Sequence, residues 1–233
     1  MNAIGPHQND KMDPFLTRMS ATCIEVLVAL FGLMIFKKAG LLFRLLILLL
    51  LYGAATDIFG WTFYKLNRSY VLIAVDIYTL AEALLMVFII ESTGLFNKLK
   101  HIFKLIYLLL FICYILAFIM MPLIGDDGAY RGTYSFGYLS TVAVLAAWAS
   151  LKWIEGAGNK LNSPVFVLLT GVFIYTFCSV FIDSFIGTTT GDAVWWIHDA
   201  ANITAYLIFA YCFYLIKKST TVEKSVINLP EKV

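Results

Sequence analysis

Seven apolar runs, each of roughly 20 residues, take up most of this chain. A helix needs about that many mostly apolar residues to cross a hydrocarbon core about 30 Å thick. Inside lipid a helix also satisfies every backbone N–H and C=O group. The sequence therefore predicts an all-α integral membrane protein with seven transmembrane helices. The runs are Phe15–Phe36, Leu41–Phe63, Tyr70–Ile90, Ile102–Ile124, Thr133–Leu151, Pro164–Ile186 and Ala193–Ile216.

The overall composition agrees with lipid as the solvent of this chain. Hydrophobic residues make up 61% of the 233 residues and charged residues only 14%, whereas a soluble domain has about a quarter of its residues charged. The net charge of +2 gives no basis for nucleic-acid binding. The four cysteines lie in apolar runs without a C-x-x-C pair, so we expect neither a disulfide framework nor a cysteine-based zinc cluster.

Positive charges between the runs predict the orientation. Twelve of the 17 lysines and arginines follow the first, third, fifth and seventh runs. The positive-inside rule then places the N-terminus outside and the C-terminus in the cytoplasm. We expect an extracytoplasmic segment over 1–14, a seven-helix transmembrane domain over 15–216 and a polar, mobile cytoplasmic tail over 217–233. The expected location is the cell (inner) membrane, with multiple passes.

Several ionisable side chains lie inside the apolar runs, where an uncompensated charge is costly. With the N-terminus outside, most of them share the outer layer of the membrane, and Glu25, Glu82 and Asn202 lie deeper. At about 100° per residue, His198, Asp199 and Asn202 share one arc of the last helix, and Asp76, Thr79 and Glu82 share one arc of the third, where Tyr78 lies one turn from Glu82. The sequence therefore predicts an outward-facing acidic pocket between the second, third, sixth and seventh helices. Its ligand-binding residues would be Glu82, His198, Asn202, Tyr78, Asp76, Asp199, Asp57 and Asp183.

Such a pocket indicates a positively charged guest. Several carboxylates without an opposing lysine or arginine cannot all ionise at low dielectric, so some carry protons or a cation compensates them. We expect Glu82 and His198 to form the central pair, and His198 to make binding pH-dependent near neutrality. The alternative for the outer residues is headgroup contact beside the aromatic belt. For Glu82 and Asn202 the alternative is an interhelical hydrogen bond that only holds the bundle together. For Glu25 the alternative is a structural pair with Arg18.

The two ends of the chain carry related patterns. The second run ends "ATDIFGW" and the sixth ends "FIDSFIG", and "VDIYTLAE" in the third is matched by "HDAANITAY" in the seventh. This similarity suggests two parallel three-helix repeats joined by the fourth helix, a 3+1+3 plan known in transporters.

Two motifs carry a resemblance to a known group. "YTLAE" in the third run and "WWIHDAAN" in the seventh resemble the Y-x-x-x-E and W-x-x-H-x-x-x-N patterns of uncharacterised bacterial seven-helix integral membrane proteins. That resemblance brings no activity with it, but it gives weight to Glu82, His198 and Asn202.

Two further families share features with the chain. Microbial rhodopsins have the same helix number and orientation but hold retinal on a lysine in the last helix; here that helix has no lysine before Lys217, which disfavours retinal. The ceramidase and adiponectin-receptor superfamily holds zinc through intramembrane His and Asp residues. A metal here would fall to His198, Glu82 and Asp199, although zinc favours more nitrogen or sulfur ligands.

Three functions remain open from the sequence. The favoured one is a binding or transport protein for a cation, a proton or a small cationic or polar ligand, and no enzyme activity is assigned. The second is a metal-dependent intramembrane hydrolase acting on lipids. The third is a receptor or sensor subunit that signals through a separate cytoplasmic partner. Besides the lipid bilayer and a small ligand or ion, the expected partners are a second copy of the chain or that cytoplasmic protein.

Overall fold

The computed structural model describes residues 14–63, 68–120, 129–157, 162–183 and 191–227. Within these ranges every regular element is helical and no strand occurs, which confirms the predicted all-α fold. The helices are α1 (Pro14–Ile35), α2 (Leu41–Phe63), α3 (Arg68–Glu91), the 3₁₀ turn η1 (Asn97–Leu99), α4 (Lys100–Ile115), the π-helix η2 (Leu116–Met120), α6 (Ala129–Ala157), α7 (Pro164–Asp183) and α8 (Gly191–Ile227).

The helices are long and apolar, as a bilayer requires. In the described part of the chain, six are long and apolar enough to cross a membrane, and α1 contributes a shorter apolar stretch over Met19–Ile35. Large apolar side chains cover the outside of the bundle, and Leu27, Met34 and Leu207 are more than half exposed. Such a surface belongs against lipid tails. The chain is therefore a helical protein suited to a multi-pass membrane location.

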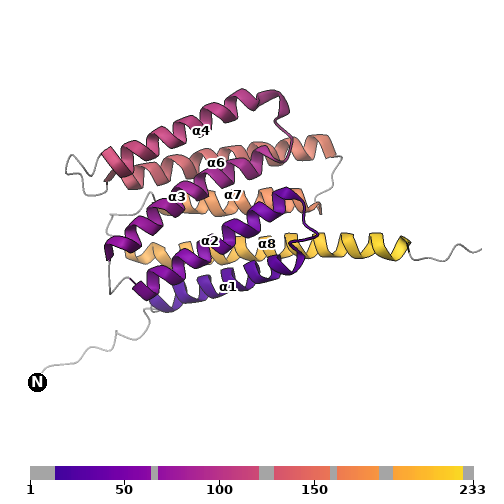
Figure 1. Cartoon of the computed structure of the whole chain (residues 1–233), viewed down its shortest axis with the longest axis horizontal. Coiled ribbons are helices and arrows are strands. Elements are labelled where there is room, and N and C mark those ends of the chain that lie inside the picture. The colour runs from indigo at the N-terminus through magenta and orange to yellow at the C-terminus, as the bar shows by residue number, and fades with distance from the viewer. Residues whose placement is uncertain (1–13, 64–67, 121–128, 158–161, 184–190, 228–233) are drawn as a thin grey trace, which may run out of the picture.

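Six of the helices follow one another around a closed ring. Helix α1 packs against α2 and α8, α7 lies between α6 and α8, and α3 contacts both α2 and α6. Helix α4 lies outside this ring, at the edge of the bundle beside α3 and α6 (Figure 1). The side chains that point into the ring from α1, α2, α3, α6, α7 and α8 therefore meet in one core.

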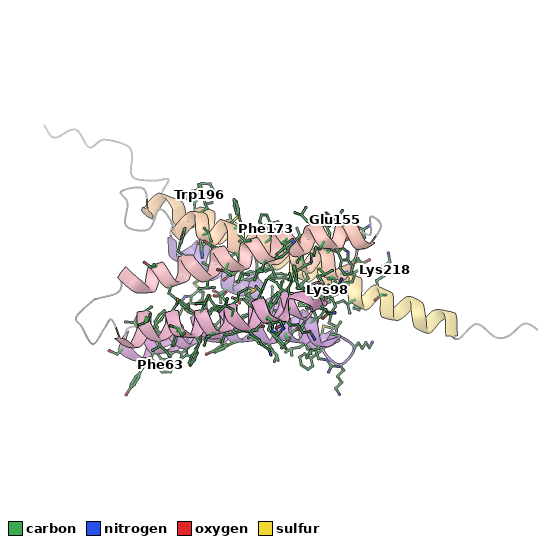
Figure 2. All side chains as sticks on the ribbon, turned by 90° about the horizontal axis from the view of Figure 1, so that it is seen from above. Phe63, Lys98, Glu155, Phe173, Trp196 and Lys218 are labelled. Atoms are coloured by element: carbon green, nitrogen blue, oxygen red, sulfur yellow. The ribbon has the colours of Figure 1, made fainter. Side chains whose placement is uncertain are left out.

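The two ends of the bundle differ in the residues they present. Figure 2 shows Lys98, Glu155 and Lys218 at one end and Phe63 and Trp196 at the other. We call the first the basic end, because the described lysines of the turns after α1 and α3 and of the stretch after Ile216 belong to it. We call the second the aromatic end.

Glycines allow close approach between neighbouring helices. A methyl group added at Gly171 on α7 would lie 2.6 Å from the ring of Phe209 on α8, and one at Gly32 on α1 would lie 2.7 Å from Ile47 on α2. Small residues at such contacts are typical of membrane bundles, where close van der Waals packing drives helix association. These two contacts fix α7 against α8 and α1 against α2.

Two helix ends differ from the sequence prediction. The last apolar run was predicted to end at Ile216, but α8 continues as a helix to Ile227. No glycine or proline interrupts the chain between Ile216 and Pro230, and extending an existing helix adds one hydrogen bond per residue without a new nucleation step. The fourth apolar run changes from an α-helix to a π-helix at Leu116. The predicted outer segment 1–14 lies outside the described residues except for Pro14.

Candidate functional site

Glu82 lies near the middle of α3 and is held by three tyrosines from three helices. Tyr138 of α6 donates a hydrogen bond to its Oε2 at 2.6 Å, and Tyr175 of α7 donates to its Oε1 at 2.6 Å. Tyr78, one turn earlier on α3, donates to the same Oε1 at 3.2 Å. The carboxyl group is only 4% exposed. Phenol donors on both oxygens form an environment that stabilises a negative charge or a proton shared with the tyrosines.

A second buried carboxyl group comes from Glu25, at the middle of α1. It too is 4% exposed. Gly53 of α2 faces it so closely that an added methyl group would overlap its Oε1, and that methyl would lie 3.0 Å from the hydroxyl of Tyr78. The hydroxyl of Tyr206 on α8 is within hydrogen-bonding reach of the same carboxyl group. The absence of a side chain at Gly53 therefore lets Glu25 lie beside Tyr78, the tyrosine that also bonds Glu82.

These side chains form a single group, which we call the carboxylate–tyrosine cluster. It draws on five helices directly, and α2 contributes the space at Gly53. In the described part of the chain, no lysine or arginine forms an ion pair with either carboxyl group. The predicted structural pairing of Glu25 with Arg18 is untested, because the Arg18 side chain lies outside the described residues. The members of the cluster are Glu25, Glu82, Tyr78, Tyr138, Tyr175 and Tyr206.

The residues singled out on the last helix form a separate polar group nearer the aromatic end. The side-chain nitrogen of Asn202 lies 3.3 Å from Nδ1 of His198, and Nδ1 of His198 lies 3.7 Å from a carboxylate oxygen of Asp199. Asp199 is 5% exposed. Among the described residues the buried side-chain oxygen of Asn202 has no hydrogen-bond partner. The structure thus brings these three predicted residues together, as their helical spacing requires.

The remaining predicted residues occupy other places. Asp57 is exposed on α2, six residues before the end of that helix, and accepts a hydrogen bond of 2.7 Å from the buried hydroxyl of Thr22 on α1. Asp76 is half-buried on α3, six residues before Glu82. Asp183 is the last residue of α7, and its side chain lies outside the described residues. Asp57 lies one turn after Gly53 on α2, and Thr22 lies one turn before Glu25 on α1. The two residues therefore lead from the surface toward the cluster.

A groove on the outside of the described bundle lies away from these residues. It has a volume of about 660 Å³ and runs between α3 and α4 on the outside of the ring. Its lining is almost wholly apolar and includes none of the residues predicted to bind a ligand. The lining residues are Leu84, Leu85, Phe88, Tyr107, Leu108 and Phe111.

The metal alternative can be compared with this geometry. Among the described residues, no group of three or more His, Cys, Asp and Glu side chains is placed to hold a metal ion. Glu82 directs its oxygens to tyrosine hydroxyl groups, which are hydrogen-bond donors in this arrangement. A zinc site at His198, Glu82 and Asp199 stays a prediction.

Sequence reasoning singled out Tyr78 but missed the tyrosine donors on the other helices, and it gave Glu25 a lesser place. Tyrosine prefers the membrane interface, where its hydroxyl group meets water. Tyr138, Tyr175 and Tyr206 lie instead well inside their apolar runs, and a buried tyrosine hydroxyl usually finds a partner. Tyrosines at mid-span depth, together with two mid-span glutamates, were the available signal. The pairing itself depends on which helices are neighbours, and the sequence does not provide that.

In comparisons with known proteins, no family model, curated protein or solved structure matches this chain.

Proposed function

We propose that this protein is a membrane binding or transport protein whose carboxylate–tyrosine cluster takes up a proton or a small cation. One observation carries the proposal: Glu82, buried in the middle of a membrane-type bundle, is bonded by tyrosines from α3, α6 and α7. A buried carboxylate without a cationic partner is costly. Glu25 beside the same tyrosine adds a second acidic group, and two such groups favour a shared proton or a bound cation between them.

The origin of the side chains supports coupling to a conformational change. The carboxyl groups of Glu25 and Glu82 come from the first three helices, whereas Tyr138, Tyr175 and Tyr206 come from the last three. Any displacement of one set of three helices against the other must break or remake these bonds. A proton or cation at Glu82 changes the strength of the same bonds, so its binding shifts the balance between the two arrangements. That is the coupling a carrier or a proton-driven switch needs.

Access is proposed from the aromatic end. Lysines gather at the basic end, and the positive-inside rule places such an end in the cytoplasm. This proposed orientation has seven spans, an external N-terminus and the cell membrane as its location. Asp57 then faces the outside, and its hydrogen bond with Thr22 begins a polar path toward Glu25. His198, Asp199 and Asn202 add further polar groups at that end, on α8.

The test measures protonation of the cluster by infrared difference spectroscopy on purified protein in lipid. We expect a carbonyl band from a buried protonated carboxylic acid that responds slowly to a change of external pH. Glu82→Gln and Glu25→Gln should each reduce or shift this band. Glu155→Gln removes an exposed acid at the basic end and should leave it unchanged. A spectrum that is the same in both cluster variants and in the wild type would disprove uptake of a proton by the cluster.

The same variants test the cation arm of the proposal. If a small cation rather than a proton is the guest, the carboxylate bands of the wild type should shift on addition of Na⁺ or K⁺ at constant pH. Glu82→Gln should abolish that shift, and Glu155→Gln should not. Absence of both the proton band and the cation shift would remove the proposed function.

A second candidate is a receptor or sensor subunit, favoured by one feature of α8. This helix continues about three turns past Ile216, and Figure 2 shows it projecting beyond the bundle at the basic end, where Lys218 is labelled. A projecting helix gives a cytoplasmic partner a rigid surface. Removal of residues 217–233 should abolish co-purification of such a partner and leave the infrared signals of the cluster unchanged.

A further inference from the structure

The groove between α3 and α4 has apolar walls that face the lipid. Leu84, Leu85 and Phe88 form the α3 wall, and Tyr107, Leu108 and Phe111 form the α4 wall. Its volume of about 660 Å³ is within the range of small-molecule sites. Helix α4 stands outside the ring of six helices. Among the described helices of that ring, α3 and α6 pack against it, and the groove opens beside the contact with α3.

A basic strip continues the α4 wall toward the basic end. Lys104 is one turn before Leu108, and Lys100 is two turns before it. At 100° per residue, both lysines fall within the same arc of α4 as Leu108 and Phe111. Lys100, His101 and Lys104 are exposed, and within the described part of the chain neither lysine forms an ion pair. One side of α4 therefore presents two unpaired positive charges followed by an apolar channel.

The acidic side chain at the α3 side of the groove already has a hydrogen-bond partner. Glu91, at the end of α3, accepts a hydrogen bond of 2.8 Å from the hydroxyl of Tyr107. This bond ties α3 to α4 where the apolar lining ends. It also directs the carboxylate of Glu91 to Tyr107 rather than to the lysines. The two positive charges on α4 remain available for an anion at the membrane surface.

We propose that the groove between α3 and α4 binds one anionic phospholipid, with its phosphate at Lys100 and Lys104 and an acyl chain along Leu84, Leu108 and Phe111. The distances agree with this. At 1.5 Å per residue, Leu108 and Phe111 lie about 6 and 10 Å deeper than Lys104, which is within one leaflet of a core about 30 Å thick. Basic pockets between transmembrane helices on the cytoplasmic side are suited to anionic headgroups.

A zwitterionic phospholipid fits the groove less well. It offers the same acyl chains, but the positively charged amine of its headgroup would lie among Lys100, His101 and Lys104. Each lysine near the membrane surface adds to the attraction of anionic lipids, and phosphate with lysine forms a strong charge-assisted hydrogen bond. Selectivity for the anionic lipid is thus a requirement of the proposal.

Lipid binding is measured by native mass spectrometry of the full chain, released from detergent after titration with dioleoylphosphatidylglycerol or dioleoylphosphatidylcholine. The wild type should bind its first phosphatidylglycerol at least tenfold more tightly than phosphatidylcholine. Lys100→Gln with Lys104→Gln should weaken the first phosphatidylglycerol by about tenfold to thirtyfold. The matched control, Lys37→Gln with Lys38→Gln, removes two exposed charges from the turn after α1 and should change this affinity less than twofold.

A second pair of variants tests the apolar part of the site. Leu108→Trp fills the groove and should weaken the first phosphatidylglycerol, whereas Leu109→Trp alters a neighbouring exposed residue outside the lining and should not. Circular dichroism confirms that each variant is helical. Equal binding of the two lipids by the wild type, or equal losses in both lysine pairs or both tryptophan variants, would overturn the proposal. None of these results depends on the carboxylate–tyrosine cluster.

Discussion

Gly53→Ala is the substitution that most directly tests the geometry of the carboxylate–tyrosine cluster. Gly53 is buried on α2, and the methyl group of an alanine there would overlap the carboxyl group of Glu25 and approach the hydroxyl of Tyr78 to 3.0 Å. The overlapping atom belongs to the end of a flexible side chain. Glu25 can therefore turn away, but in doing so it leaves the hydroxyl of Tyr206. The substitution converts a steric change on α2 into a broken polar contact between α1 and α8.

The magnitude follows from two opposing effects. Alanine in place of glycine favours a helix by up to about 1 kcal/mol. Against this, overpacking a tight core costs about 1–3 kcal/mol, and an interhelical hydrogen bond in a membrane protein contributes about 0.6 kcal/mol on average and up to about 1.7 kcal/mol. We expect Gly53→Ala to lower the free energy of unfolding by about 1–2 kcal/mol. Gly137→Ala on α6, where an added methyl group meets nothing within 4 Å, should leave it unchanged or raise it slightly.

The assay is equilibrium unfolding in mixed micelles with increasing SDS, with circular dichroism as the signal. A double-mutant cycle with Glu25→Ala identifies the cause, because residues in contact give non-additive changes. In the Glu25→Ala background the carboxyl group is absent, so Gly53→Ala should no longer destabilise the protein. If Gly53→Ala keeps its full cost in that background, or has the same effect as Gly137→Ala in the wild type, Glu25 does not lie against Gly53.

Two further substitutions test the helix contacts and the hydrogen bonds of Glu82. Gly171→Ala should destabilise the bundle by about 1–3 kcal/mol, because its methyl group would lie 2.6 Å from the ring of Phe209; a thermal unfolding temperature at or above that of the wild type contradicts this. Tyr138→Phe should lower the free energy of unfolding by about 1 kcal/mol, since its hydroxyl donates to Glu82 at 2.6 Å. Tyr134→Phe should be neutral in the same SDS titration, because in the described part of the chain the buried Tyr134 hydroxyl has no hydrogen-bond partner. Equal losses in the two tyrosine variants count against the assigned donor.

The helices could be predicted from the sequence because length and hydropathy alone determine them in lipid. Leu41–Phe63 was predicted with the same bounds as α2, and the predicted start at Pro164 is the start of α7. The errors fall at ends where polar residues follow an apolar run. Helix α8 continues through Lys217 and Lys218 because nothing in that stretch breaks a helix, and hydropathy marks where a membrane ends rather than where a helix ends.

The local part of the site could also be predicted, since it depends on helical spacing. Tyr78 with Glu82, and His198 with Asn202, are four residues apart, and both pairs are in contact. The contacts between distant helices were out of reach. Tyr175 and Glu82 are 93 residues apart in the chain, and their meeting depends on the ring order that makes α3 and α7 face one core.

A structural role alone gives a poor account of a carboxyl group at Glu82. If the group served only to hold helices together, a neutral amide could accept hydrogen bonds from two helices without bringing an acid into the membrane. Replacing buried ionic groups with apolar residues is often neutral or stabilising, so stability by itself does not require glutamate there. What a carboxyl group adds is the ability to gain and lose a proton while its tyrosine donors remain in place. Glu82→Gln therefore separates the two roles: a structural role predicts a stability loss with no change in the infrared response of the protein to pH, whereas proton binding predicts loss of that response in a variant that stays folded.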